Sequence, residues 1–530
     1  MMQDTHGRSA ARLRPRERAR APLLACLAAA LAAAPAAAQQ ATPARLTLRE
    51  VVGATLAHSA DIAQSRWEVE AQAGGRQAAA GAFDPLARAS VMGDQSRTPY
   101  FGTGDAGPGT SMARTLDYGA GVDWRLRSGV VLTPGLSYSR VDGAGEAAVA
   151  RNTGVASVGV LFPLLRGRGG GTLTASERAA ATTLDASRAD LAHVRASSVL
   201  SAVNAYWGYL AAVRTVEVLR EAEGRAEVLL RQTMTLIQAD ERPAVDRLPV
   251  LANLASKRAA RLSGESGVAS ARQALAQAMG LAPERLATLP APADAFPATP
   301  DSASAAAAAA DREGVVRGAL ERRADLAAAS RRREASRQLL DAARAEQRAR
   351  LDLNLTVGYT GIATGPTVDR LFTPFYAPDR GVHARMGFSY GLPLGNHAAG
   401  GAFLRSTAAD RRAEIARDEL AREIALAVAT AAETLERTVE ELRLSDEAVR
   451  LHTLSVESES QKFRLGTSTL FDVIQAEDGL TGATLSLIST QRRYAAALAQ
   501  LRFQTGALVG GPEGSDVDFA GLSSWAPAAR

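Results

Sequence analysis

Residues 463–476 read FRLGTSTLFDVIQA, a short turn between two long segments with helical periodicity. No Gly or Pro lies between Phe403 and Leu465, and apolar residues there recur every three or four positions, which marks one face of a helix. These apolar residues are Leu420, Ile424, Val428, Ala431, Leu435, Val439 and Leu442. Gly466 lets the backbone reverse between two antiparallel helices. The stretch therefore predicts a hairpin of two long helices.

The helix after the turn has apolar residues at a strict spacing of seven: Val473, Leu480, Leu487, Tyr494, Leu501 and Leu508. A seven-residue repeat is typical of coiled-coil packing against a neighbouring helix. The helix before the turn would run for roughly 65 residues, or about 100 Å at 1.5 Å per residue. These stripes indicate helix packing and carry no catalytic chemistry.

The chain contains two copies of one unit. The start of each copy matches at an offset of 325 − 61 = 264, as in Asp61 and Asp325. The end of each copy matches at an offset of 472 − 246 = 226, as in Asp246 and Asp472. The difference, 264 − 226 = 38, means that the first copy holds about 38 extra residues. We place them around the segment 126–140, which has the pattern of a β-hairpin.

The repeat divides the chain into segments. The first copy covers residues 46–289, with its own long helix from about Thr172 to Ile237, and the second covers residues 311–510. Residues 290–310 begin with PAPADAFPATP and predict a Pro/Ala linker between the copies. A C-terminal tail takes up residues 511–530.

Stretches that alternate apolar with small or polar residues lie between the helices of each copy. Of the 25 aromatic residues, 13 lie in residues 83–166 and 351–394, about a quarter of the chain. Aromatic residues beside alternating strands are typical of the girdles of outer-membrane barrels, although a soluble sheet can show the same pattern. The expected strands lie in two regions, about 86–162 (Leu86–Gln95, Tyr118–Leu126, Val130–Arg140 and Thr153–Phe162) and about 353–392 (Leu353–Gly361 and Val382–Leu392).

Residues 1–38 have the order of a secretory signal peptide, with a basic, an apolar and a small-residue part. The apolar run Leu23–Ala34 is too short to span a bilayer, which takes roughly 20 residues, and we expect cleavage after Ala38. A lipoprotein signal with Cys26 as the lipidated residue is the alternative, but most of the apolar run follows that cysteine. No later apolar stretch is long enough for a spanning helix, so the exported chain is predicted to be periplasmic, secreted or an outer-membrane β-barrel protein.

The formal net charge of +5 does not indicate nucleic-acid binding. Residues 1–38 hold six Arg against one Asp and one Glu, so 6 − 2 = +4, and the rest of the chain carries 5 − 4 = +1. Nucleic-acid binding needs clustered positive charge on the folded part. We therefore expect no nucleic-acid partner.

No set of residues predicts catalysis, a metal or a cofactor. The Gly-rich segment 167–171 is not followed by Gly-Lys-Ser/Thr, so it is not a P-loop, and a strand-to-helix corner explains it. The six histidines form no His-x-x-x-His pair, and the chain has no nucleophile elbow. We therefore expect neither an enzyme nor a bound cofactor.

Several segments, in this order, resemble the outer-membrane efflux protein family, the TolC-like channels. They are LTLREVV at 46–52, ADIA at 60–63, PLGNHAAG at 393–400, and FRLGTSTLFDVIQA running into a helix that ends LRFQTG at 501–506. The resemblance implies a mainly α-helical fold with a membrane β-barrel portion: an α-helical barrel plus an outer-membrane β-barrel shared by a homotrimer. It also implies two strands per repeat and twelve in the shared barrel. Four or six strands are too few to close around a channel, and open edges in lipid are costly, so several chains must contribute.

The resemblance identifies the turn after Phe463 as the periplasmic tip, where an adaptor protein docks and the channel narrows. The docking residues are then Arg464, Leu465, Gly466, Thr467 and Ser468. Asp472 matches the constriction aspartate of the family, and Asp246 holds the corresponding position in the first copy. Three chains would bring rings of carboxylates together, an arrangement that attracts cations. A first-turn acid favoured by the helix dipole is the alternative reading of Asp472.

The tip departs from the family pattern in three ways. Gln475 holds the second constriction position, where the family often has an acid. Phe463 and Ser468 stand where a Tyr and an Arg of the family lock the closed state, which puts that lock in doubt. The first copy has Asp240-Glu-Arg-Pro-Ala in place of the tip glycine, which predicts a turn that is built differently.

These implied properties predict a passive exit duct in the outer membrane of a Gram-negative bacterium, with a periplasmic extension. The duct would serve a tripartite efflux or type I secretion system, in which a periplasmic adaptor joins it to an inner-membrane pump. Its cargo would be small molecules or proteins. The alternative is a periplasmic coiled-coil adaptor or scaffold protein without a barrel.

Overall fold

The computed structural model describes residues 45–101, 107–144, 151–298, 312–365, 373–376, 380–510 and 516–523. The predicted signal peptide, with Cys26, lies outside these residues, as do parts of the predicted linker and tail. Within the described ranges, no helix has both the length and the apolarity that a membrane-spanning helix needs. The helices and strands all belong to one structural unit, Arg45–Arg530.

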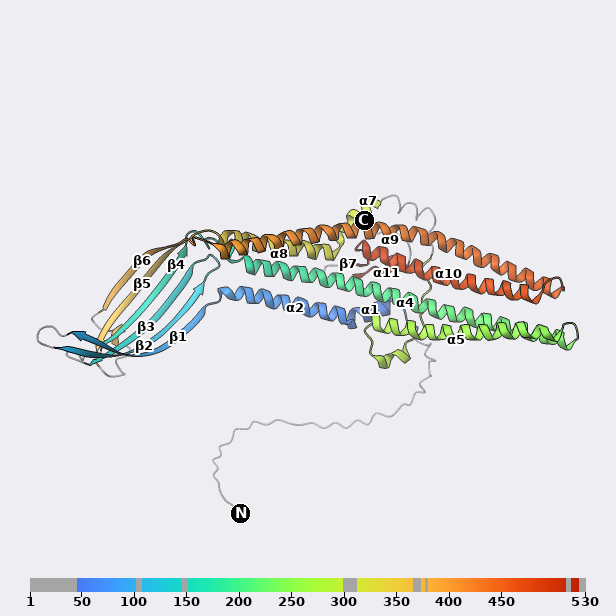
Figure 1. The fold of residues 1–530 in the computed structure, drawn as a ribbon, viewed down its shortest axis with the longest axis horizontal. Helices are drawn as coiled ribbons and strands as arrows, with labels where there is room; N and C mark the ends of the chain where they lie inside the picture. Colours follow the sequence, from blue (N-terminus) through green and yellow to red (C-terminus); the bar gives the residue numbers. More distant parts are fainter. Residues whose placement is uncertain are drawn as a thin grey trace, which may run out of the picture. The chain divides into compact units, whose positions relative to one another are not determined.

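Two pairs of long helices dominate the unit (Figure 1). In the first copy these are α4 (Ala175–Gln238) and α5 (Arg247–Ala278), and in the second α9 (His397–Arg464) and α10 (Leu470–Gln504). The shorter helices are α1 (Leu48–His58), α2 (Ala60–Ala80), α3 (Gly170–Leu173), α7 (Arg312–Arg322), α8 (Ala324–Glu346) and α11 (Phe519–Ser523). Short 3-10 turns include η1 (Gly81–Phe83), η2 (Ala244–Asp246), η3 (Pro283–Thr288) and η5 (Thr373–Phe375). The long helices lie where the apolar periodicity predicts them.

Six antiparallel strands form one sheet in the order β1-β2-β3-β4-β5-β6. They are β1 (Leu86–Phe101), β2 (Pro108–Arg125), β3 (Val131–Ala144), β4 (Arg151–Pro163), β5 (Arg350–Thr364) and β6 (Arg380–Gly391). The first copy supplies four of them and the second copy two, joined where β4 pairs with β5. A small second sheet pairs β7 (Val509–Gly510) with β8 (Asp516–Val517), which lies within the predicted tail.

The two extra strands account for the unequal lengths of the copies. Leu86 and Arg350, which begin β1 and β5, are separated by 350 − 86 = 264, whereas Gln238 and Arg464, which end α4 and α9, are separated by 464 − 238 = 226. The change of offset therefore falls on β2 and β3, which together span residues 108–144. All six strand segments predicted from the sequence are present, and the first copy departs from the two strands per repeat that the resemblance implies, because the inserted residues extend the sheet as a β-hairpin.

The first part of the linker packs against the helices. Leu46 forms an isolated parallel bridge with Pro292, and the Tyr206 hydroxyl on α4 donates a hydrogen bond of 2.6 Å to Oδ2 of Asp294. Tyr206 is completely buried, and this burial raises the pKa of its hydroxyl. The described part of the linker thus contacts both α4 and the segment just before α1, and helps to hold them together.

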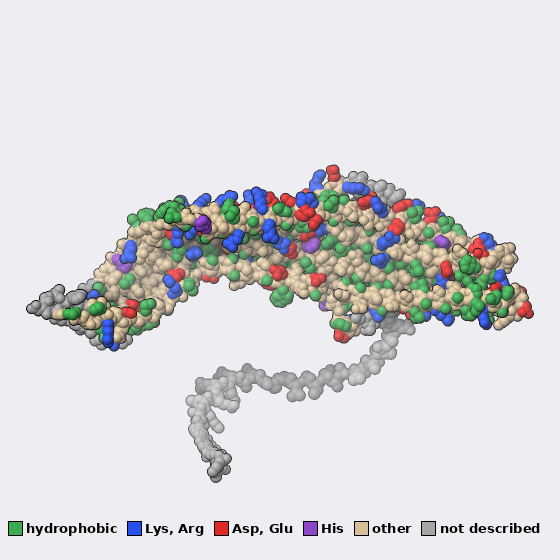
Figure 2. Space-filling view, viewed as in Figure 1, with side chains coloured by type: hydrophobic (Ala, Val, Ile, Leu, Met, Phe, Trp, Pro, Cys, Tyr) green, Lys and Arg blue, Asp and Glu red, His purple; other side chains and the backbone are tan. Residues whose placement is uncertain are grey.

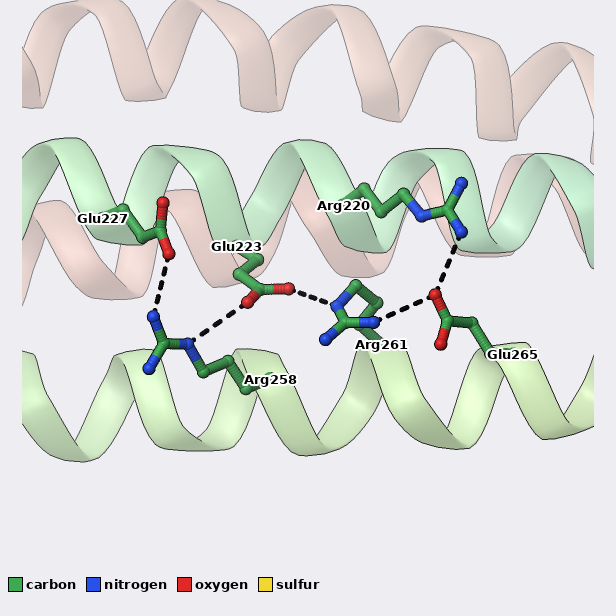
Figure 3. Close-up of polar contacts among 6 residues, drawn as sticks. All are labelled: Arg220, Glu223, Glu227, Arg258, Arg261 and Glu265. Atoms are coloured by element: carbon green, nitrogen blue, oxygen red, sulfur yellow. Dashed lines mark hydrogen bonds and ion pairs between the residues drawn. The ribbon is translucent and has the colours of Figure 1, made fainter.

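Both hairpins have buried apolar contacts, but they differ in the ion pairs between their helices. Between α4 and α5, ion pairs form a continuous ladder of Arg220, Glu265, Arg261, Glu223, Arg258 and Glu227 (Figure 3). The N···O distances in this ladder run from 2.5 to 3.2 Å. Between α9 and α10 the contact is mainly apolar, with Leu435, Leu442, Tyr494 and Leu498 buried together and an ion pair between Arg493 and Glu441. Salt is therefore expected to weaken the first hairpin more than the second.

Candidate functional site

The turns of the two hairpins lie side by side at one end of the helices. Leu229 of α4, Val250 of α5 and Val473 of α10 are buried in one cluster. The guanidinium of Arg242, in the first turn, lies 4.9 Å from the ring centroid of Phe463, in the last turn of α9. We call residues 239–248 and 463–472 together the tip.

Both turns of the tip have the same backbone. Gly466 has φ 76°, and Asp240, its counterpart in the first copy, has φ 54°. In each turn the next amide donates to the carbonyl five residues back: Glu241 N to Leu236 O at 2.9 Å, and Thr467 N to Lys462 O at 2.9 Å. This pairing closes a helix through a left-handed residue, and Asp tolerates that conformation better than most residues. The prediction that the first turn is built differently is therefore wrong for the reversal itself. It is right for the start of the next helix, because the first turn continues into η2 and α5 without a side-chain cap, whereas α10 begins with a capping box.

Asp472 caps the helix that follows the turn. Its Oδ2 accepts hydrogen bonds from Thr469 N at 2.9 Å, from Thr469 Oγ1 at 2.6 Å and from Ser468 Oγ at 3.3 Å. The Thr469 side chain in turn accepts from the Asp472 amide, which completes a capping box. The hydroxyl and backbone hydrogen bonds from Thr469 hold the pKa of Asp472 below its usual range. The carboxylate is thus charged at neutral pH and has a structural role of its own.

Asp246 holds the matching place on the first hairpin, where η2 runs into α5. Its carboxylate lies 3.7 Å from the guanidinium of Arg242, so this arginine contacts both Asp246 and Phe463. Gln475, one turn into α10, has an exposed side chain. One chain therefore places two predicted constriction acids at the start of neighbouring helices, and the contact between Arg242 and Phe463 joins the two turns.

The tip exposes apolar side chains, and the sequence interpretation named only one of them, Leu465, and missed Val245 and Phe471. Leu465 is 78% exposed, Phe471 69% and Val245 65%. Figure 2 shows hydrophobic side chains among charged ones at this end of the helices. Val245 and Phe471 are related by the repeat offset, 471 − 245 = 226, and each directly precedes the aspartate of its copy. That offset was the signal that could have found them. Arg464 and Thr467 are also exposed, whereas Ser468 is partly buried.

The sheet has two chemically different faces. Residues directly opposite each other on neighbouring strands share a face, so the pairing defines rows across the sheet. One row contains Ala89, Ala120, Leu136, Ala156, Tyr359 and Val382. The row next to it on the opposite face contains Arg88, Gly121, Gly135, Ser157, Gly358 and His383. One face is therefore apolar and the other small or polar.

Much of the apolar face is open to its surroundings, although η5 covers part of it, where Tyr359 donates a hydrogen bond to the Phe375 carbonyl and Tyr138 is buried. Val382 is 79% exposed, Met386 69% and Val357 58%. Aromatic residues on this face form two levels, with Trp124, Phe162, Phe388 and Tyr390 nearer the helices and Tyr118, Tyr138 and Tyr359 farther along the strands. An exposed apolar surface of this kind is typical of a surface that contacts lipid or another protein.

No protein-family model matches the chain, and no curated protein matches it by sequence. Solved structures do match it. The outer membrane protein VceC of Vibrio cholerae is 18% identical with a TM-score of 0.63, covering 87% of this chain and 96% of VceC. The Campylobacter jejuni CmeC outer membrane channel is 14% identical with a TM-score of 0.62, covering 89% and 90%. The chain has the fold of an outer-membrane channel.

A third channel fits the same description. The Neisseria gonorrhoeae MtrE outer membrane channel, solved in its open state, is 16% identical with a TM-score of 0.59 and covers 87% of this chain and 88% of that one. The prediction of a TolC-like fold, mainly helical with a β portion, is confirmed. In this fold the sheet and the tip are the two candidate functional surfaces, because both expose apolar side chains in the single chain. Among the residues with described positions, no three His, Cys, Asp or Glu side chains group as metal ligands would.

Proposed function

We propose that this chain is a subunit of a TolC-like outer-membrane channel, a passive exit duct of an efflux or type I secretion system. The observation that carries the proposal is the sheet, whose exposed apolar face backs onto a face of small and polar residues. Such a sheet suits a wall between lipid and water. The alternative, an adaptor or scaffold without a barrel, does not account for this apolar face, because such a protein would not contact lipid with a sheet.

The channel would be a homotrimer whose helices extend into the periplasm. Three copies would bring three Asp472 and three Asp246 carboxylates to the tip, with the neutral Gln475 one turn further on. Carboxylates gathered in a narrow passage favour cations over anions. Residues Arg464–Ser468, of which the first four are exposed and Ser468 is partly buried, would contact a periplasmic adaptor that links the duct to an inner-membrane pump.

Membrane fractionation and detergent extraction test the proposal. The expected result is a protein that sediments with outer membranes, is extracted as a trimer and conducts ions in planar bilayers. A mature protein that stays in the supernatant as a monomer would contradict the proposal and favour the adaptor alternative.

Charge substitutions test the constriction separately. Asp472→Asn keeps an oxygen for the cap but removes the charge, so cation preference in single-channel recordings should fall, and further with Asp246→Asn. The control is Asp185→Asn, because Asp185 lies near the sheet end of α4, where it pairs with Arg188. Unchanged ion selectivity in the double variant would remove the constriction role from both aspartates.

A further inference from the structure

The inserted hairpin of β2 and β3 is a full part of the sheet. All of β1 is paired with β2, from Leu86 opposite Asp123 to Phe101 opposite Pro108. On the other side of the hairpin, β3 pairs with β4. A hairpin that stood outside the sheet would leave β1 to pair with β4. In the structure both neighbours of the hairpin are bonded to the hairpin itself.

The hairpin also continues the two faces of the sheet. On the apolar face, Tyr118 of β2 lies opposite Val91 on one side and Tyr138 on the other. On the polar face, Gly119 lies opposite Ser90 and Ser137. The inserted strands therefore have the lipid-facing and water-facing chemistry of the strands around them.

The start of α3 and α4 accommodates the turn of the hairpin. Gly129, in the turn, has φ 97°, and a Cβ there would lie 2.4 Å from the carbonyl oxygen of Gly167. Arg127 in the same turn donates two hydrogen bonds, of 2.9 and 2.8 Å, to the carboxylate of Glu177 in the first turn of α4. Within the Gly-rich segment, Gly170 also packs closely on the turn, because a Cβ there would lie 3.1 Å from the carbonyl oxygen of Arg127. The corresponding corner of the second copy, PLGN at 393–396, has only one glycine. Among the described residues, no inserted hairpin packs against that corner.

The outer strands of the sheet need partners. β1 and β6 end the strand order of the described sheet, so each has one free side. Unpaired backbone groups are costly in lipid, and six strands are too few to close around a channel. The two edges belong to opposite ends of the same sheet, so β6 of a second copy can extend β1 and continue both faces.

We propose that three copies of this chain, pairing β1 of one copy with β6 of the next, close a wall of 3 × 6 = 18 strands. This inference rests on the proposed function. Barrel diameter grows roughly linearly with strand number, so this wall is about 1.5 times as wide as one of twelve strands. The wall is lined by small or polar residues and is wide, so the helical tip, and not the membrane section, sets the size of the hydrophilic cargo.

Imaging the trimer in lipid nanodiscs tests the inference directly. The expected map shows threefold symmetry and eighteen strands, with residues 108–144 inside the wall. A closed wall of twelve strands with these residues outside it overturns the inference and leaves the proposed function intact. A monomer that does not enter lipid overturns the proposed function itself.

Cysteine pairs give a second readout without imaging. In a Cys26→Ala background, which removes the only cysteine of the chain, Ser90→Cys on β1 is combined with His383→Cys, Arg385→Cys or Gly387→Cys on β6. All four positions lie on the polar face. The expected result is an intermolecular disulfide in at least one pair, giving a covalent trimer on denaturing gels. An intramolecular bond between Ser90→Cys and Ser157→Cys of β4 would instead place the hairpin outside the wall.

Deleting residues 107–144 tests the consequence for width. The deleted segment is as long as the excess of the first copy, and its loss leaves β1 antiparallel to β4. The variant should form a trimer with twelve strands. When polymers are added from the sheet side, the largest polymer that enters the variant channel should be smaller than the largest one that enters the wild-type channel. Equal exclusion limits would overturn the wider wall. If the variant does not fold, the cysteine pairs decide.

Discussion

Asp240 and Gly466 hold the same place in the two helical hairpins, and both have a left-handed backbone. Only the second is a glycine, yet the hydrogen bonds that close the two turns match. The shape of the turn is therefore imposed by the pairs of helices that pack on either side of it, and Asp240 accepts a conformation that is unfavourable for a residue with a Cβ.

We expect Gly466→Ala to destabilise the tip by about 1 kcal/mol, because alanine is strained at φ 76°. Hydrogen exchange of the amides that end α9 and begin α10 measures the effect. The matched control is Gly482→Ala in the helical part of α10, where a Cβ meets nothing within 4 Å. That change should stabilise by up to about 1 kcal/mol. Equal effects of the two substitutions would contradict the conformational argument.

Glu477 on α10 gives the tip region a pH dependence. Its side chain is 9% exposed, and burial raises the pKa of its carboxyl, although Arg225 and Lys257 oppose the shift. The folded state therefore holds this proton more tightly than the unfolded state, so stability falls as the pH rises from the ordinary glutamate pKa through the raised one.

The substitution Glu477→Gln should remove the loss of stability at high pH, because glutamine does not ionise. The variant should have a higher melting temperature than the wild type at pH 8, and the difference should shrink toward pH 4, where the wild-type carboxyl is protonated. Thermal unfolding at several pH values checks this. The control is Glu457→Gln, an exposed position on α9, which should be neutral. A constant difference between Glu477→Gln and wild type across the pH range would show that titration of Glu477 is not the cause.

Gly129→Ala should disrupt the turn between β2 and β3. The new Cβ would meet the Gly167 carbonyl oxygen at 2.4 Å in a backbone with φ 97°, and strain of this kind costs about 1–3 kcal/mol. Gly143→Ala, on β3 with nothing within 4 Å of the new Cβ, should change stability by less than about 0.5 kcal/mol. Urea unfolding midpoints in detergent compare the two. If Gly129→Ala proves as mild as Gly143→Ala, the close packing of the turn on the corner is not present in the protein.

Leu465→Ser and Phe471→Ser should weaken adaptor docking without affecting the channel. Each apolar side chain is mostly exposed in the single chain and would be buried by a docked adaptor, so each loss should lower affinity about tenfold. Surface plasmon resonance with the host adaptor measures this, and planar-bilayer conductance should be unchanged. Leu454→Ser, on α9 and 56% exposed, is the control away from the tip. Full affinity in the Leu465 and Phe471 variants would move the docking surface elsewhere.

Local pattern predicted much of this protein. The apolar steps around Leu435 and the seven-residue spacing after Val473 place α9 and α10, because helix periodicity is set by neighbours along the chain. Of the predicted docking residues, Leu465, Gly466 and Thr467 do lie on an exposed turn, and Asp472 does lie in the first turn of a helix. The sequence interpretation missed Phe471 and Val245 because exposure depends on what packs around a residue. It also did not foresee that Asp240 has the same left-handed backbone as Gly466, although it was right that the first turn leads into its helix differently.

Spacing along the chain was enough to establish the long helices, the two-copy plan and the presence of about 38 extra residues in the first copy. The role of those extra residues could be read only from the folded molecule. Strand pairing joins distant segments, as when Arg151 lies opposite Thr364, and whether an inserted hairpin widens a sheet or stands apart depends on hydrogen bonds to both neighbours. Those bonds put β2 and β3 inside the sheet and leave β1 and β6 as its free edges.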